Sequence, residues 1–151
     1  MSKHPNTMKK RTALLGRLWA RWWHLWGLSL CYMGHTTHDR SFYRAGVGSF
    51  QRATRCWPDF APAHYRRGLI RGRELGEYAA AIADLERASA LLPEWPEPYL
   101  QRGLFHRFNG KPAQALADLR RFVELSPEGY WRDEAGRQIA AIEAESAGGM
   151  V

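Results

Sequence analysis

The chain has 151 residues, of which 45% are hydrophobic, and a formal net charge of +7. This length suits one domain with a core of its own, and the apolar and aromatic content excludes a wholly disordered chain. Two cysteines are too few for a disulfide framework or a four-thiolate zinc site.

The positive charge is concentrated at the beginning of the chain. Residues 1–40 carry seven Lys or Arg and one Asp, a net charge of +6, whereas residues 41–95 carry +2 and residues 96–151 carry −1. A nearly neutral body argues against nucleic-acid binding by the whole domain. Nucleic acid is therefore not expected as the main partner.

The first predicted element is a basic, Trp-rich helix within residues 1–26. Leu and Trp side chains cover most of its surface between residues 14 and 26, and basic side chains recur along one narrow stripe. This pattern is typical of helices that lie in the plane of a membrane surface. The side chains expected to dock on a membrane or on a partner protein are Lys10, Arg17, Leu18, Trp19, Arg21, Trp22, Trp23 and Trp26.

Three other interpretations of this segment stay open. A transmembrane helix needs about 20 apolar residues, and Arg17 and Arg21 interrupt the apolar run. The same arginines, and the lack of a small-residue cleavage site, disfavour a cleavable signal peptide. The Trp side chains can also pack on the first repeat or on a partner subunit as an N-terminal cap. We expect a cytoplasmic protein that is peripheral at a membrane.

A repeated pattern fills residues 27–129. The tripeptide Arg67-Gly68-Leu69 recurs 35 residues later as Arg102-Gly103-Leu104, while Gly76 recurs 34 residues later as Gly110. The earlier copy therefore contains one extra residue, which lies within Ile70–Leu75. A weaker copy lies upstream, so three units are predicted over residues 27–60, 61–95 and 96–129.

Each unit is predicted to be a pair of helices. Pro62 and Pro98 stand near helix starts, and Gly76 and Gly110 fall in the turns between paired helices. Residues 130–145 form a closing helix that covers the last unit, and the tail 146–151 is expected to be frayed. One face of the closing helix carries Trp131, Ala135, Ile139 and Ile142. The predicted fold is an all-α solenoid of helical hairpins.

The pattern resembles the tetratricopeptide repeat (TPR) family, whose repeat has 34 residues. The small residue at its position 8 is matched by Gly34, Gly68 and Gly103, and the Pro at its position 32 by Pro58, Pro93 and Pro127. The small residue at its position 20 is matched by Ala81 and Ala115. The resemblance implies a non-enzymatic interaction scaffold in which the first helices of the units line a concave groove.

The resemblance also implies which side chains face the groove. Carried over position by position, they are Leu28, Cys31, His35, His38, Tyr65, Leu69, Arg73, Leu100, Leu104, Arg107 and Phe108. Such a groove is apolar in the middle and basic at one edge, so it suits a protein or peptide with apolar anchors and an acidic residue. The Lys/Asn/Arg clamp of chaperone-binding members is missing, so an Hsp70 or Hsp90 tail is not the expected ligand.

No catalytic motif or cofactor-binding motif is recognisable, so we expect no enzyme activity and no cofactor. Cys31, His35 and His38 share one face of a predicted helix, but a fourth ligand is not evident and no metal site is expected. The pair Arg66-Arg67 is interpreted as part of a solvated face.

The leading hypothesis is a non-enzymatic adaptor or assembly factor that is membrane-associated through its N-terminal helix. The alternative is a structural subunit of a larger, membrane-bound complex, in which the four N-terminal Trp side chains are buried against protein. A nucleic-acid binder that uses the basic N-terminus ranks third, and an enzyme last.

Overall fold

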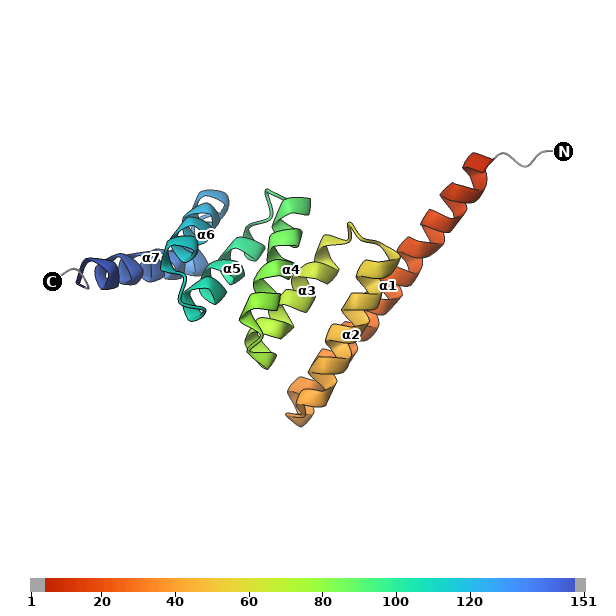
Figure 1. Ribbon diagram of the computed structural model, residues 1–151, viewed down its shortest axis with the longest axis horizontal. Coiled ribbons are helices and arrows are strands. Elements are labelled where there is room, and N and C mark those ends of the chain that lie inside the picture. Colours follow the sequence, from red (N-terminus) through yellow and green to blue (C-terminus); the bar gives the residue numbers. More distant parts are fainter. Residues whose placement is uncertain (1–4, 149–151) are drawn as a thin grey trace.

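The computed structural model describes residues 5–148, with side chains from residue 12 onward, and every regular element in that range is helical. The all-α prediction is confirmed. In chain order the elements are α1 (Pro5–Thr37), α2 (Arg40–Cys56), α3 (Ala61–Ile70), the π-helix η1 (Arg71–Leu75), α4 (Tyr78–Leu91), α5 (Pro96–Phe108), α6 (Pro112–Leu125) and α7 (Tyr130–Gly148) (Figure 1).

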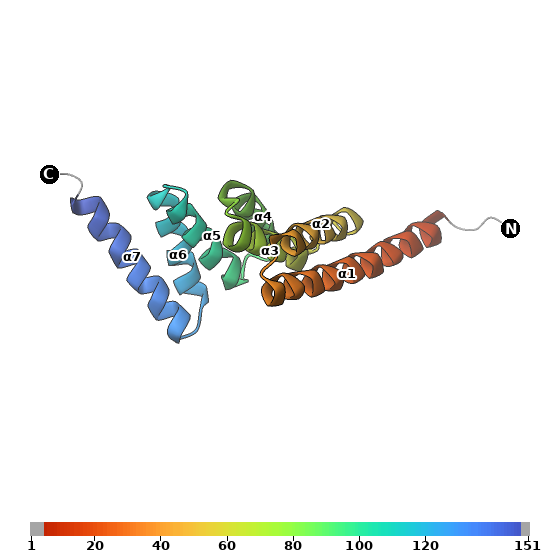
Figure 2. The same ribbon diagram turned by 90° about the horizontal axis from the view of Figure 1, so that it is seen from below.

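The helices form three antiparallel hairpins, α1 with α2, α3 with α4, and α5 with α6. The hairpins are stacked along one direction, and α7 closes the stack at the end opposite α1 (Figures 1 and 2). Each hairpin packs on the next through its second helix, because α2 contacts α3 and α4 contacts α5. The result is a solenoid.

The first helix is longer than the sequence patterns suggest. We expected a separate N-terminal helix up to residue 26 and a first repeat from residue 27, but α1 runs without interruption from Pro5 to Thr37. The N-terminal segment is therefore an extension of the first helix of the first hairpin. At the other end of the chain, α7 continues to Gly148, beyond the expected end at residue 145.

The turns within the hairpins have clear local causes. Gly76 and Gly110 adopt positive φ angles of 73° and 69°, a left-handed conformation that glycine tolerates best. Between α1 and α2, the Asp39 carboxylate accepts a hydrogen bond of 2.8 Å from the backbone N–H of Ser41. This bond caps α2 and lowers the pKa of Asp39.

The extra residue predicted within Ile70–Leu75 coincides with η1. A helix that takes in one additional residue without breaking forms a π-helical turn. Gly72 lies in this turn, directly against the ring of Phe105 from α5, and a β-carbon at Gly72 would overlap that ring. The insertion is thus absorbed where the second hairpin meets the third.

Paired helices approach closely at the repeated glycines. A β-carbon built on Gly68 would lie 3.0 Å from the carbonyl oxygen of Ala81 and 3.0 Å from Cγ of Leu85. At Gly103 the equivalent distance to Cγ of Leu119 is 2.9 Å. The recurring small residue is therefore a steric requirement of the hairpin.

The core runs along the stack as a series of apolar clusters. In the last cluster, Leu119 of α6 packs with Ala135 and Ile142 of α7. Trp131 was expected on the same face of the closing helix, and this prediction is wrong, because its side chain is 58% exposed. Trp131 lies in the first turn of α7, beside the loop at residues 126–129, where it lines a pocket.

Candidate functional site

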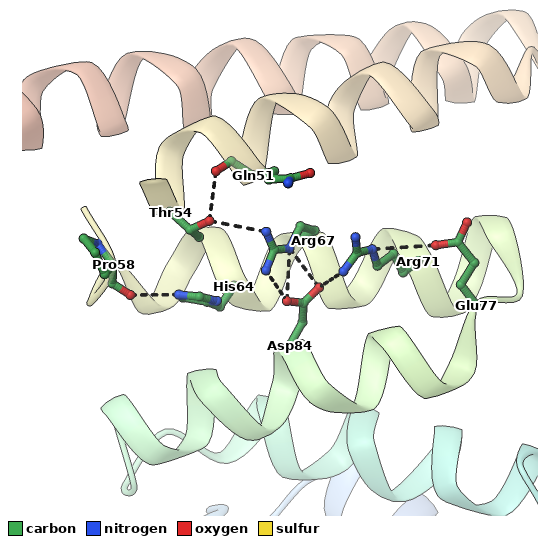
Figure 3. Close-up of polar contacts among 8 residues, drawn as sticks. All are labelled: Gln51, Thr54, Pro58, His64, Arg67, Arg71, Glu77 and Asp84. Atoms are coloured by element: carbon green, nitrogen blue, oxygen red, sulfur yellow. Dashed lines mark hydrogen bonds and ion pairs between the residues drawn. The ribbon is translucent and has the colours of Figure 1, made fainter. Parts of the chain in front are cut away.

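A polar network around Asp84 of α4 connects the second hairpin to α2 of the first (Figure 3). Arg67 of α3 donates from Nε to both carboxylate oxygens of Asp84, at 3.0 and 2.9 Å. Arg71 donates to the same carboxylate at 2.8 Å. Arg67 also donates a hydrogen bond of 3.3 Å from Nη1 to the hydroxyl of Thr54 in α2. One buried carboxylate therefore joins both helices of its own hairpin to the hairpin before it.

The next hairpin repeats this network at equivalent positions. Arg102 donates from Nε to Asp118 at 2.8 Å and from Nη1 to the hydroxyl of Ser89 at 3.0 Å. The hydrogen bond with Asp118 raises the pKa of Arg102. His106 takes the place of Arg71, with Nε2 3.7 Å from Asp118. The interpretation of Arg66-Arg67 as a solvated face is thus wrong for Arg67, whose partner is 17 residues away.

A second repeated contact fixes the start of each first helix. His64 Nε2 donates to the carbonyl oxygen of Pro58 at 2.8 Å (Figure 3). At the equivalent place in the next hairpin, the Tyr99 hydroxyl donates to the carbonyl oxygen of Pro93 at 3.1 Å. Burial lowers the pKa of His64, so the neutral ring is favoured in this position. These two sets of contacts connect each hairpin to the segment before it.

A pocket of about 400 Å³ lies where α3, η1 and α5 meet the start of α7. Three of the side chains predicted for the groove, Tyr65, Arg73 and Leu100, come together in it. The remaining lining residues are Pro96, Glu97, Gln101, Phe122, Ser126, Pro127, Glu128, Gly129, Tyr130, Trp131 and Arg132. This volume is sufficient for one large apolar side chain.

Two arginines of the pocket are held in place by neutral acceptors. Arg73 donates to the amide oxygen of Gln101 at 2.9 and 3.2 Å, and Arg132 donates to the carbonyl oxygen of Ser126 at 2.8 Å. Within residues 12–148, neither guanidinium is in an ion pair with a carboxylate. Both are thus positioned and still able to accept an anionic ligand group.

Tyr65 forms the wall of the pocket on the side of α3. Its ring packs on Trp95 with a centroid separation of 4.6 Å. Burial raises the pKa of the Tyr65 phenol, although Arg66 and Arg73 act in the opposite direction. The hydroxyl therefore stays protonated and available as a hydrogen-bond donor.

The other predicted groove residues of the second and third hairpins lie outside this pocket. Leu69 and Leu104 are half-buried. Arg107 contacts α7, where it bonds to Gln138 and, at 2.7 Å, to Glu145. Phe108 is exposed and stacks on Tyr78 with centroids 5.7 Å apart. Position in the repeat alone did not indicate these contacts, because they depend on α7 and on the turn after α5.

The predicted groove residues of the first hairpin are not gathered in one site. Leu28 is half-buried, and Cys31 packs against Gly46 of α2. Burial raises the pKa of the Cys31 thiol to about 11. His35 and His38 are exposed. No three Cys, His, Asp or Glu side chains of the described chain are grouped to hold a metal ion.

Sequence analysis missed three pocket residues, Tyr130, Trp131 and Arg132. They follow Gly129, which has a φ of 146°, and they lie in the first turn of α7. The sequence feature that could have indicated them is an aromatic pair, Tyr130 and Trp131, at the start of a helix, where neighbouring helices bury side chains less completely. We had placed Trp131 on the apolar face of the closing helix instead.

A second surface of interest is an exposed apolar face on α1. We call it the outer face of α1; it consists of Leu14, Leu15, Leu18, Trp19, Trp22, Leu25 and Trp26, which are 49% to 63% exposed. Trp22 stacks on Trp26 with ring centroids 6.1 Å apart and meets Trp19 edge-on at 5.9 Å.

The remaining residues predicted for docking are placed differently. Trp23 is half-buried against Ala20 and Ala53, with the Arg52 guanidinium 4.8 Å from its ring centroid. Arg17 and Arg21 are exposed, and the Arg17 guanidinium lies 5.1 Å from the ring centroid of Trp57. The side chain of Lys10 lies outside the described residues. Over the part of the chain that the structure describes, no helix has the length and apolar character required to cross a membrane.

Comparison with known proteins identifies the repeats. The model of the tetratricopeptide repeat family matches residues 61–93 and 96–128, which are the second and third hairpins with their turns. The chain contains tetratricopeptide repeats (TPR) over residues 61–128. The α1–α2 hairpin lies outside the matched residues. No curated protein matches the chain.

Solved structures of other TPR domains share the fold. The first TPR of Spaghetti (RPAP3), bound to the HSP90 peptide SRMEEVD, is 22% identical, with a TM-score of 0.67 over 82% of this chain and 95% of that one. The Arabidopsis OM64 TPR domain is 18% identical, with a TM-score of 0.72 over 83% and 98%. The Yersinia enterocolitica chaperone SycD, in complex with a peptide of YopD, is 16% identical, with a TM-score of 0.66 over 78% and 92%.

Proposed function

We propose that this protein is a non-enzymatic adaptor that holds a segment of another protein in the pocket where α3, η1 and α5 meet the start of α7. The observation that carries the proposal is the pocket of about 400 Å³, with an apolar wall and two arginines that lack a carboxylate partner among the described residues. Peptide binding by the similar domains of RPAP3 and SycD supports the same use of the fold.

The chemistry of the pocket defines the ligand. Tyr65, Leu100 and Trp131 suit a large apolar side chain, while Arg73 and Arg132 suit a carboxylate beside it. The HSP90 peptide that RPAP3 binds is not the proposed ligand, because Tyr65, Leu69 and Leu104 stand where chaperone-binding members place polar clamp residues. We therefore propose an extended peptide with an apolar anchor next to an acidic residue.

The proposal is tested by selecting peptides from a displayed random library against the full chain and measuring the affinity of the winners. Trp131→Ala and Arg73→Gln are expected to weaken binding by roughly tenfold or more each, since both side chains contact the ligand. Phe108→Ala is the matched control, because Phe108 is equally exposed but lies outside the pocket. Selected peptides that bind all three variants as tightly as the wild type would overturn the proposal.

We further propose that α1 holds the adaptor at a membrane. The exposed Leu and Trp side chains of the outer face of α1 and the net charge of +6 over residues 1–40 support this location. A structural subunit with the same face buried against protein is the alternative. If the protein is such a subunit, the isolated chain is expected to self-associate, and detergent is not expected to substitute for the missing partner protein.

A further inference from the structure

We infer that the outer face of α1 binds the surface of a bilayer that contains anionic phospholipids, with α1 lying in the membrane plane and the solenoid standing away from it. The inference rests on the proposed membrane association and names the lipid class, the orientation and the side chains involved. Its support comes from exposure, aromatic arrangement, charge and shape.

The outer face of α1 is an apolar surface at the first end of the solenoid, and no other helix of the described chain covers it. At the far end, α7 covers the apolar side of α6. One side of α1 packs on α2 and on the segment that leads into α3, whereas its opposite side carries Leu18, Leu25 and Trp22 at 54%, 63% and 49% exposure. Solenoids normally end in a polar surface, because an apolar end invites association. These side chains are spaced three and four residues apart, so they form one continuous apolar strip.

The Trp side chains of the strip are arranged for an interface between apolar and polar media. Trp22 contacts both Trp19 and Trp26, and none of the three indole N–H groups donates to another described residue. A ring with an apolar body and an unbound polar edge favours the headgroup region of a bilayer. Four exposed Leu side chains supply the part that enters the acyl boundary.

Charge selects the lipid class. Residues 1–56, which include α1 and α2, contain ten Lys or Arg and one acid, Asp39, whereas residues 57–151 carry a net charge of −2. Arg17 and Arg21 flank the apolar strip and have no ion-pair partner among residues 12–148. Anionic headgroups are attracted to such a hairpin, at about fivefold in affinity per basic residue near the surface.

The same charge argues against a second copy of the chain as the occupant. A symmetric dimer through the outer face would bring two strongly positive hairpins together, and like charges repel. Shape also favours a flat surface, because α1 is a long rod that forms one end of the stack and extends beyond α2 (Figures 1 and 2).

The test measures co-sedimentation of the full chain with vesicles of phosphatidylcholine alone and of phosphatidylcholine with phosphatidylserine. We expect binding to the anionic vesicles that weakens with added salt, and quenching of Trp fluorescence by brominated lipid. The double variant Leu18→Glu/Trp22→Glu is expected to lose at least tenfold in affinity. Arg17→Gln/Arg21→Gln is expected to lose about 25-fold on anionic vesicles only.

Matched controls remove similar groups elsewhere. Leu92→Glu/Phe108→Glu places two acids at exposed apolar sites outside α1 and outside the pocket, and Arg87→Gln/Arg120→Gln removes two exposed charges from the other hairpins. Both control variants are expected to bind vesicles nearly as the wild type does. The circular dichroism of the control variants and of the α1 variants is expected to be unchanged. A loss of vesicle affinity in the α1 variants is then caused by the change to the outer face of α1 and not by unfolding.

Each other outcome overturns the inference in a distinguishable way. Equal binding to neutral and anionic vesicles removes the anionic selectivity but leaves membrane association standing. No binding to either vesicle removes the membrane part of the proposed function as well, and peptide binding in the pocket is measured separately. A dimer in sedimentation equilibrium that Leu18→Glu/Trp22→Glu dissociates assigns the face to a second copy.

Discussion

The guanidinium of Arg67 donates from Nε to both oxygens of the Asp84 carboxylate, at 3.0 and 2.9 Å. These hydrogen bonds connect α3 to α4 inside the stack. Asp84 is 4% exposed and also holds Arg71. A single carboxylate thus pairs with two arginines in a largely buried place, and Glu77 supplies Arg71 with a second negative charge 3.6 Å away.

Replacing Asp84 by Ala is expected to destabilise the protein by about 3–5 kcal/mol, because the largely buried guanidinium of Arg67 loses its carboxylate partner and Arg71 keeps only Glu77. Urea unfolding followed by circular dichroism measures the change. Asp59→Ala is the control, since Asp59 pairs with Arg87 at the surface and its loss is expected to cost less than about 1 kcal/mol. Equal effects of the two substitutions would contradict the assigned role of Asp84.

The repeated glycines give a second stability prediction. Gly68→Ala places a methyl group 3.0 Å from the carbonyl oxygen of Ala81, so we expect a loss of about 1–3 kcal/mol. Gly136→Ala, in the middle of α7, meets nothing within 4 Å and is expected to stabilise by about 0.5–1 kcal/mol. Thermal melts of both variants check the opposite signs; a shift in the same direction would mean that close approach at Gly68 does not limit the hairpin.

Acid is expected to destabilise the fold through three histidines. Burial lowers the pKa of His24, His64 and His106 below the ordinary value of 6.5. The unfolded chain therefore binds protons that the folded chain does not, and the stability present above about pH 6.5 decreases as the pH falls below it.

Urea midpoints between about pH 7.5 and pH 5.5 measure this dependence. His64→Gln is expected to flatten it, whereas His35→Gln, at an exposed ring, is expected to leave it unchanged. A midpoint that stays constant with pH in the wild type would show that proton uptake by these rings does not accompany unfolding.

The two cysteines are expected to differ in reactivity. Burial raises the pKa of Cys31 to about 11, so its reactive thiolate is scarce near neutral pH, while Cys56 is exposed. Iodoacetamide should therefore modify Cys56 well before Cys31, as followed by mass spectrometry of the peptides. Modification of both at the same rate would indicate that α1 separates readily from α2 at Gly46.

The periodicity of the sequence predicted the hairpins and the place of the inserted residue. Gly68 and its copy Gly103 recur because paired helices approach closely there, and Gly76 and its copy Gly110 recur because the turns require a positive φ. It did not predict the continuity of α1 across residue 26, although no proline interrupts that stretch. Arg107 and Trp131 were misjudged because their surroundings are supplied by α7 and the loop before it. A repeat pattern contains no information about a neighbour that is not itself a repeat.

The uninterrupted course of α1 has a mechanical consequence. The segment with Leu18 and Trp22 and the segment with Leu28 and His35 are parts of one rod, with Leu18 and Leu28 about 15 Å apart along its axis. Without a hinge between them, a tilt imposed on one segment is inherited by the other. Anchoring the first turns would thus set the angle at which the whole solenoid is presented to its cargo.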